Sequence, residues 1–392
     1  MKKTISILGS TGSIGLSTLS IVDKKKNYFK VHLLSAKKNY KIAYKQILKY
    51  SPIFFIITDP VIYKKLKSKI KSKKTVILNS FKHVNFKKKN DITISAIPGI
   101  AGLEPTLKLI KSSKKMLIAN KESIICGWDL IKHSAKVNKS KIIPIDSEHF
   151  SIFKLIENHD LKEIKKVYLT ASGGPFLNYK LSKLKKVTPK EALKHPKWKM
   201  GKKISIDSAT LMNKIFELVE AQKIFNLPNN KLDILIHPDS LVHAIVEFKG
   251  GLIKFIYHET SMIIPLANAI FEGDLDIENF YKTKKSNLNS KIQNLNFKKV
   301  DERIFPIVKL KKRINEHYST PIIINAANEI LVDQFLQKKI PFFSIFKFIM
   351  NTLNDRNYKK YAIRRPKKIN DIYLIDNWAR ATTLEKIKFN NE

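Results

Sequence analysis

The stretch TISILGSTGSIGLSTLSIV, residues 4–22, decides the predicted fold. It contains an apolar strand at 4–8, a turn with glycines at positions 9, 12 and 15, and the start of a helix. Glycine lets the backbone approach a pyrophosphate closely, and the N–H groups at the start of a helix bind its charge. Such glycines can also serve plain packing, but their position directly after an N-terminal strand favours nucleotide binding.

Strands and helices alternate through the rest of the first 146 residues. Helical spacing is found at 40–50 and 102–113, and the further strands are expected at 29–36, 52–58, within 91–99, at 116–119 and at 142–145. Alternation at this spacing predicts a parallel, doubly wound sheet. The fold class is therefore α/β, with a Rossmann-like sheet in the N-terminal domain, 1–146.

The pattern changes after residue 146. A strand opens into a Gly-Gly turn within 164–176, and the stretch 235–259 predicts two or three antiparallel strands joined at Gly250-Gly251. This indicates a central α+β domain over 147–275. A polar linker is expected at 276–300, and the pattern over 301–392 is mainly helical.

Composition describes a globular chain of 392 residues with a net charge of +41, from 74 basic and 33 acidic residues. Lysine runs occur along the whole chain, which favours a compositional bias on solvated faces over a dedicated nucleic-acid surface. The single cysteine, Cys126, fits a reducing compartment and is expected to be a small buried residue. No stretch is long enough to span a bilayer. We expect a cytoplasmic protein without nucleic-acid or membrane partners.

The end of the second predicted strand indicates which nucleotide is bound. An NAD-binding domain places an acidic residue there to hold the ribose hydroxyls. This chain has Lys37, Lys38 and Asn39 instead. The lysines could be a stray pair in a lysine-rich chain, but the missing acid favours NADP.

Two carboxylates follow the last predicted strand of the sheet, in KIIPIDSEH, residues 141–149. On an extended strand end, Asp146 and Glu148 would point the same way and could share a cation. Oxygen ligands suit Mg²⁺ or Mn²⁺. Alternatively, Asp146 or Ser147 caps a helix that begins near His149. This stretch alone does not decide between the two.

The stretch 205–225 predicts a helix with a broad apolar face, capped by Asp207 or Ser208. Asn213, Lys214 and Glu217 share its remaining face. They could complete a metal and substrate site, or they could form a solvated face.

Three other segments carry candidate ligand-binding groups. Lys121 follows a strand end and could orient a substrate oxygen or be surface. Ser172, before Gly173-Gly174, can offer a hydroxyl and backbone N–H groups to a phosphate. Trp198 lies in a polar, basic stretch that suits a lid closing over a ligand.

Several of these motifs together resemble the 1-deoxy-D-xylulose 5-phosphate reductoisomerase family. They are GSTGSIG (9–15), ANKES (119–123), DSEH (146–149), SGGPF (172–176), HPKWKMGKKISIDSATLMNK (195–214) with Glu217, and NAANE (325–329). The resemblance implies NADPH- and divalent-metal-dependent rearrangement and reduction of 1-deoxy-D-xylulose 5-phosphate to 2-C-methyl-D-erythritol 4-phosphate, in non-mevalonate isoprenoid biosynthesis. It also implies a homodimer, an NADPH-binding domain at 1–146, a catalytic domain at 147–275 with a lid near 195–203, and a C-terminal helical bundle.

The resemblance also assigns roles to individual residues. The implied metal ligands, for Mg²⁺, Mn²⁺ or Co²⁺, are Asp146, Glu148 and Glu217, which with Lys121 form the catalytic set. NADPH contacts are implied for Thr11, Gly12, Ser13, Ile14, Lys38, Asn39, Asn120, Glu122 and Gly201. Substrate contacts are implied for Lys121, Ser147, Glu148, Ser172, His195, Ser208, Asn213, Lys214 and Glu217.

The chain departs from the family pattern at three places. Lys37 and Ile215 stand where the family usually has glycine, and the stretch 258–265 lacks the usual arginine and aspartate. None of the three is an implied metal ligand. Two rival hypotheses remain: an NADP-dependent semialdehyde or homoserine-type dehydrogenase, and a basic nucleic-acid-binding protein.

Overall fold

The computed structural model describes residues 2–71, 74–198, 200–273, 275–281 and 295–389. The chain forms two compact units. The first unit comprises Met1–Ser123, Trp128–Phe150 and Ser261–Lys284, and the second comprises Ile124–Gly127, Ser151–Thr260 and Lys285–Glu392. No helix among the described residues is both long enough and apolar enough to cross a membrane.

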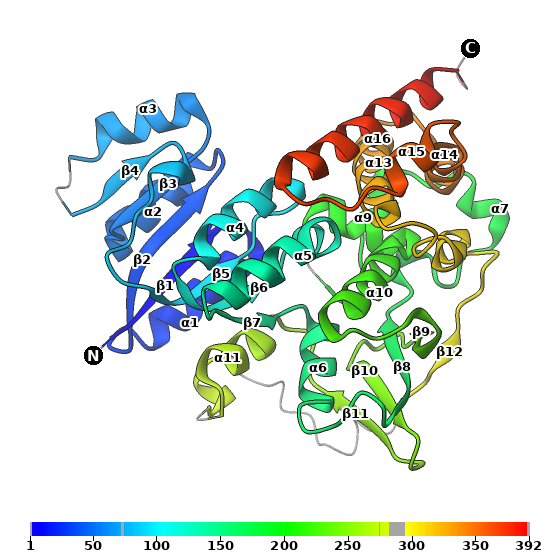
Figure 1. The fold of residues 1–392 in the computed structure, drawn as a ribbon, viewed down its shortest axis with the longest axis horizontal. Helices are drawn as coiled ribbons and strands as arrows, with labels where there is room; N and C mark the ends of the chain where they lie inside the picture. The colour runs from blue at the N-terminus through cyan, green and yellow to red at the C-terminus, as the bar shows by residue number, and fades with distance from the viewer. Residues whose placement is uncertain (1, 72–73, 199, 274, 282–294, 390–392) are drawn as a thin grey trace. The chain divides into compact units, whose positions relative to one another are not determined.

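The first unit contains a parallel sheet with the strand order β4-β3-β2-β1-β5-β6-β7, drawn from blue to green in Figure 1. Its strands are β1 (Lys3–Leu8), β2 (Phe29–Ala36), β3 (Phe54–Ile57), β4 (Val76–Leu78), β5 (Asn90–Ser95), β6 (Ser113–Ile118) and β7 (Lys141–Pro144). The predicted doubly wound parallel sheet is confirmed. β4, a three-residue edge strand beside β3, was not predicted.

Helices connect most of the consecutive strands, which is the usual connection between parallel strands, and the connection from β4 to β5 contains a short 3-10 helix, Phe81–His83. The connecting α-helices are α1 (Ser13–Lys24), α2 (Tyr40–Tyr50), α3 (Pro60–Lys69), α4 (Leu103–Ile110) and α5 (Lys121–Val137, of which Ile124–Gly127 belong to the second unit), and α11 (Ile263–Phe271) belongs to the first unit. The strand order reverses at β1, which pairs with both β2 and β5. Open α/β sheets bind ligands at such a switch point, outside the carboxyl ends of the strands.

The second unit contains a five-stranded sheet with the order β11-β10-β8-β9-β12. Its strands are β8 (Ile164–Ala171), β9 (Leu232–Ile236), β10 (Val242–Phe248), β11 (Ile253–Tyr257) and β12 (Lys298–Lys299). The antiparallel hairpin at Gly250-Gly251 is confirmed as β10 and β11. However, β9 does not join that hairpin, because it pairs in parallel with β8.

The helices of the second unit include the elements that carry its candidate site. They are α6 (Ser147–Leu155, whose first turn belongs to the first unit), α7 (Leu181–Leu184), α8 (Pro189–Ala192), α9 (Lys202–Thr210), α10 (Met212–Phe225), α13 (Thr320–Leu336), α14 (Ser344–Leu353), α15 (Tyr358–Ala362) and α16 (Ile369–Phe389). The C-terminal part is mainly helical, as predicted, and α13 packs against both α14 and α16. Residues 282–294 of the predicted linker lie outside the described residues. The functional domain boundaries stay a prediction.

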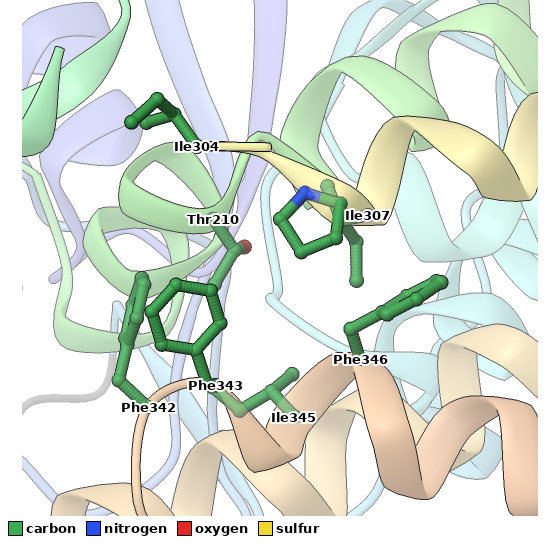
Figure 2. Close-up of a pocket in the computed structure, with 8 residues that line it drawn as sticks. Thr210, Ile304, Ile307, Phe342, Phe343, Ile345 and Phe346 are labelled. Carbon is green, nitrogen blue, oxygen red and sulfur yellow. The ribbon is translucent and has the colours of Figure 1, made fainter. Parts of the chain in front are cut away.

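A small hollow in the second unit is lined almost entirely by apolar side chains (Figure 2). The rings of Phe342, Phe343 and Phe346 and the side chain of Ile307 line it, and Thr210 supplies a hydroxyl. That hydroxyl already donates to backbone carbonyls of its own helix, at Ile206 and Asp207. The hollow therefore lacks the charged groups that a sugar phosphate needs.

Candidate active site

The glycine-rich turn after β1 has the shape that its sequence predicted. Gly9 has a φ of +83°, and a Cβ there would lie 2.7 Å from the carbonyl oxygen of Ala96. A Cβ on Gly15 would lie 2.5 Å from the carbonyl oxygen of Gly9. Gly12 precedes α1 without a side-chain cap, so the first N–H groups of the helix remain for a ligand. Gly12 and Ser13 are exposed. The turn fits a pyrophosphate.

The loop after β2 carries the predicted ribose-phosphate contacts. Lys37, Lys38 and Asn39 are all exposed at the carboxyl end of the strand. The side chain of Asn39 caps α2 by accepting a hydrogen bond from the N–H of Ile42 (3.2 Å). The segment therefore presents two ammonium groups and no carboxylate to this edge of the sheet.

Asn120 and Glu122 follow β6 at the same edge. The Asn120 amide donates to the carbonyl oxygens of Ile97 (2.5 Å) and Gly99 (3.1 Å). Its own oxygen accepts from the N–H of Ser123 (2.6 Å), so it caps α5. These bonds give Asn120 a structural role in shaping the loop after β5, and its contact with NADPH stays a prediction.

Asp146 and Glu148 lie at the carboxyl end of β7. An oxygen of one lies within 4.8 Å of an oxygen of the other. The predicted geometry was wrong, because α6 begins at Ser147 and Glu148 therefore lies in a first helical turn and not on an extended strand. The capping alternative is also correct, since Asp146 accepts from the N–H of Glu148 (3.3 Å). One carboxylate thus caps the helix and faces the second carboxylate.

The surroundings of Asp146 keep it ionised. Burial alone would raise its pKa, but the Lys121 ammonium, with which it forms an ion pair, and the His149 ring lower it overall. Glu148 accepts a hydrogen bond from the Ser147 hydroxyl (2.7 Å). Two negatively charged oxygen donors at this spacing fit a hard divalent cation.

The second unit carries the third predicted carboxylate on α10. Glu217 has 0% relative exposure, so the alternative of a solvated face is wrong for this residue. Asn213 donates to one of its oxygens, and Lys214 Nζ lies 2.6 Å from the other. The predicted grouping of these three side chains on one helix face is confirmed. A buried carboxylate requires such partners to remain charged.

The helix start predicted at Asp207 or Ser208 was wrong, because both residues lie inside α9. The break comes at Leu211, which has a φ of +65° and joins α9 to α10. A residue other than glycine rarely adopts this backbone conformation. Such a conformation persists only where the surrounding structure holds the backbone in it. Asp207 Oδ1 accepts from Asn328 of the NAANE motif (2.7 Å), and Lys203 pairs with Oδ2 (3.0 Å). These two contacts of the buried Asp207 carboxylate were not predicted from the sequence.

Ser172 follows β8 and forms a hydrogen bond with His195. The Nδ1 atom of His195 accepts from the backbone N–H groups of Lys197 (3.1 Å) and Trp198 (2.9 Å), so the proton lies on Nε2. Nε2 then donates to the Ser172 hydroxyl oxygen (3.0 Å), which also accepts from the N–H of Gly174 (3.1 Å). With its oxygen accepting twice, Ser172 can direct its own proton to a ligand oxygen.

Ser208 lies beside this serine loop. Gly174 has a φ of +63°, and a Cβ there would lie 2.9 Å from the carbonyl oxygen of Ser208. The glycine therefore allows the last turn of α9 to approach the loop. Gly201, in contrast, is exposed at the start of α9, with nothing within 4 Å of a Cβ. The second unit thus brings Ser172, His195 and Ser208 together, and Gly201 stands apart.

His195 is expected to remain neutral well below pH 6.5. Burial lowers its pKa to about 4, and the Lys214 ammonium adds to the shift. Because the folded pKa lies below the unfolded value of 6.5, this group's contribution to stability is complete above pH 6.5 and is lost as the pH falls toward 4. His195→Gln should remove that part of the pH dependence of unfolding. An NMR titration with a midpoint for His195 near its unfolded value would contradict the assignment.

The fold and these side chains indicate the class of protein. An open, doubly wound parallel sheet with a glycine-rich turn, joined to a unit with buried charged and hydroxyl side chains, is typical of α/β enzymes that use a dinucleotide.

Comparison with known proteins gives the family. The family model described as 1-deoxy-D-xylulose 5-phosphate reductoisomerase matches residues 5–127, and those for the C-terminal domains of the same enzyme match residues 142–225 and 259–382. A relative of that name from Pelagibacter ubique is 44% identical over 96% of this chain and 97% of its own. One from Thermodesulfovibrio yellowstonii is 38% identical over 99% of this chain and 100% of its own. The chain belongs to the 1-deoxy-D-xylulose 5-phosphate reductoisomerase family.

Solved structures agree with this assignment. A crystal structure of DOX-P reductoisomerase in complex with NADPH, fosmidomycin and magnesium matches with a TM-score of 0.90 and 31% identity, over 100% of this chain and 99% of the other. The enzyme from Zymomonas mobilis in complex with NADPH matches with a TM-score of 0.87 and 32% identity, over 99% of both chains.

Proposed function

We propose that this protein is an NADPH- and divalent-metal-dependent enzyme that rearranges and reduces 1-deoxy-D-xylulose 5-phosphate to 2-C-methyl-D-erythritol 4-phosphate. The observation that carries the proposal is the buried Glu217 carboxylate held by Asn213 and Lys214, within a motif of the family. The purified protein, supplied with NADPH, Mg²⁺ and this substrate, should form the product in an NMR assay. Absence of product would contradict the proposal.

Most of the residues proposed to bind NADPH belong to the first unit, and Gly201 belongs to the second. The turn residues Thr11, Gly12, Ser13 and Ile14 bind its pyrophosphate, and Lys38 and Asn39 contact the 2′-phosphate. Asn120, Glu122 and Gly201 complete the proposed set. Steric evidence at Gly9 and Gly15 supports the pyrophosphate position, because side chains there would clash with the backbone of the turn and of the Ala96 loop. NADPH supplies the hydride.

Asp146, Glu148 and Glu217 are proposed to hold the divalent cation, either Mg²⁺ or Mn²⁺, with Co²⁺ as a further candidate. Their ionised oxygens are the ligands that such cations prefer. A bound cation would supply Lewis-acid polarisation of the substrate carbonyl. Lys121 and Lys214 now neutralise two of the carboxylates. If a cation were bound there, the two ammonium groups would be able to hold substrate oxygens.

The substrate phosphate is placed in the second unit. Ser172 donates its hydroxyl proton, neutral His195 keeps that hydroxyl oriented, and Ser208, Asn213 and Lys214 supply the remaining donors. Ser147, Lys121 and the carboxylates Glu148 and Glu217 are proposed to contact the reacting end. Binding the phosphate, which is remote from the reacting carbons, supplies energy for orienting them.

Trp198 is proposed to act as part of a lid near 195–203, of which residue 199 lies outside the described residues. The indole is half-buried and meets the His243 ring edge-on, with ring centroids 6.2 Å apart. Trp198→Ala should weaken substrate or fosmidomycin binding by about one to two powers of ten, because burying an aromatic side chain contributes about 1.5–3 kcal/mol. The melting temperature should change little. A large loss of thermal stability with unchanged binding would show that Trp198 is a core residue.

A homodimer is also proposed. β11 is the edge strand of its sheet, and it exposes Ile253 (62%) and Phe255 (46%). Exposed apolar edge strands pair readily with another chain. Sedimentation should give the mass of two 45.2 kDa chains, and a monomer at micromolar concentration would contradict the proposal. A cytoplasmic location is also proposed, because the single cysteine of the chain, Cys126, excludes an intramolecular disulfide and fits a reducing compartment.

A further inference from the structure

Gln46 forms two hydrogen bonds with one residue of the glycine-rich turn. It lies on α2 and is buried, as is Ser10. The Ser10 hydroxyl donates to Gln46 Oε1 (2.6 Å), and Gln46 Nε2 donates to the Ser10 carbonyl oxygen (2.9 Å). One amide thus bonds both the side chain and the backbone of Ser10. A buried side chain with a satisfied donor and a satisfied acceptor holds its partner in one orientation.

Ser35, on β2, holds the turn from another element. Its hydroxyl accepts from the N–H of Gly9 (2.9 Å), and its carbonyl oxygen accepts from the N–H of Ser10 (2.8 Å). These bonds fix the start of the turn. They do not contact the Ser10 carbonyl, which is bonded by Gln46.

The orientation of that carbonyl determines the direction of the next N–H. In a trans peptide the C=O of one residue and the N–H of the next point in opposite directions. Because Gln46 holds the Ser10 carbonyl toward α2, the N–H of Thr11 points away from α2. Thr11 begins the segment proposed to bind the pyrophosphate, and its side chain is partly exposed.

We infer that Gln46 is a positioning residue for the cofactor: it sets the peptide plane that presents the Thr11 N–H to the pyrophosphate. This inference rests on the proposed binding of NADPH. Gln46 does not itself contact the cofactor, so its effect should appear in cofactor affinity and not in the chemical step.

Gln46→Met tests the inference, because methionine has a similar length and forms neither hydrogen bond. The dissociation constant and KM for NADPH should rise about tenfold or more, as expected for losing two buried hydrogen bonds. The kcat and the KM for 1-deoxy-D-xylulose 5-phosphate should stay within about twofold of the wild type. Ser10→Ala, which keeps the bond to the Ser10 carbonyl, should weaken NADPH binding less than Gln46→Met does.

The matched control is Asn90→Leu. Asn90 is also buried, and its amide donates to the carbonyl oxygen of Ile92 (2.5 Å) and to the Thr93 hydroxyl (2.9 Å). However, it lies at the first residue of β5, at the opposite edge of the sheet from the turn. It should lower the melting temperature and leave NADPH affinity unchanged. Equal losses of NADPH affinity in Gln46→Met and Asn90→Leu would overturn the inference. The affinity for NADPH would then depend on the stability of the protein and not on the position of the turn.

Gln46→Glu serves if the methionine variant does not fold, because it keeps the acceptor for Ser10 and loses the donor. It should also bind NADPH more weakly, at both low and high salt. Wild-type affinity, or a loss that disappears at high salt, would overturn the inference. A wild-type protein that binds no NADPH would instead overturn the proposed function, so the two failures are distinguishable.

Discussion

Glu217→Gln is expected to reduce metal-dependent turnover by a factor of about a thousand, the upper end of the range for losing one group that stabilises the transition state. Glutamine keeps the shape of the side chain and removes the negative charge that a divalent cation requires. It also leaves Lys214, whose Nζ now lies 2.6 Å from Glu217, without its carboxylate. NADPH affinity should not change, because the pyrophosphate binds to the glycine-rich turn. Steady-state kinetics and NADPH titration measure the two quantities separately.

The same helix offers a matched control. Glu220 is buried on α10 but is not a proposed ligand. Glu220→Gln should alter stability and keep most of the turnover, whereas Asp146→Asn should behave like Glu217→Gln. If NADPH affinity fell as far as activity in Glu217→Gln, or if Glu220→Gln were equally inactive, the carboxylate on α10 would be structural.

A preference for NADPH over NADH of about a hundredfold in kcat/KM is the second large expected effect, because a charge-assisted pair with the 2′-phosphate adds affinity that NADH cannot gain. The loop after β2 presents Lys37 and Lys38 and has no acid to hold free ribose hydroxyls. Lys38→Ala should raise the KM for NADPH and leave that for NADH unchanged. Lys45→Ala, on an exposed position of α2, is the control and should change neither. Equal efficiency with both cofactors would contradict the proposed position of the 2′-phosphate.

The local features of the fold could be predicted from the sequence. The glycine-rich turn was predicted correctly because much of the requirement for glycine is local: Gly9 has a positive φ, and a Cβ on Gly15 would lie 2.5 Å from the carbonyl oxygen of Gly9. The polar face of α10 was also predicted, since helical spacing alone brings Asn213 and Lys214 to Glu217. The strand β4 was missed because its three residues are too few to show a period.

Features that depend on distant residues could not be predicted. A helix break at Leu211 requires a non-glycine residue at a φ of +65°, which no local signal indicates. The bond from Asn328 to Asp207 joins residues 121 positions apart, and the bonds from Gln46 to Ser10 join residues 36 apart. For Asp146 and Glu148, strand alternation predicted that the two carboxylates lie close together, and they do, but Glu148 lies in the first turn of a helix and not on a strand. Contacts between residues far apart in the sequence depend on how the elements pack, and the periodicity of apolar residues does not reveal them.

The central claim is that NADPH oxidation by this protein requires both the sugar phosphate and a divalent cation. The decisive measurement follows NADPH absorbance with 1-deoxy-D-xylulose 5-phosphate, first with Mg²⁺ or Mn²⁺, then with excess chelator, and then after the cation is restored. We predict oxidation that stops with the chelator and returns with the cation, and oxidation by Glu217→Gln that stays about a thousandfold slower even when the cation is present. Oxidation that continued at the same rate in excess chelator would contradict the claim.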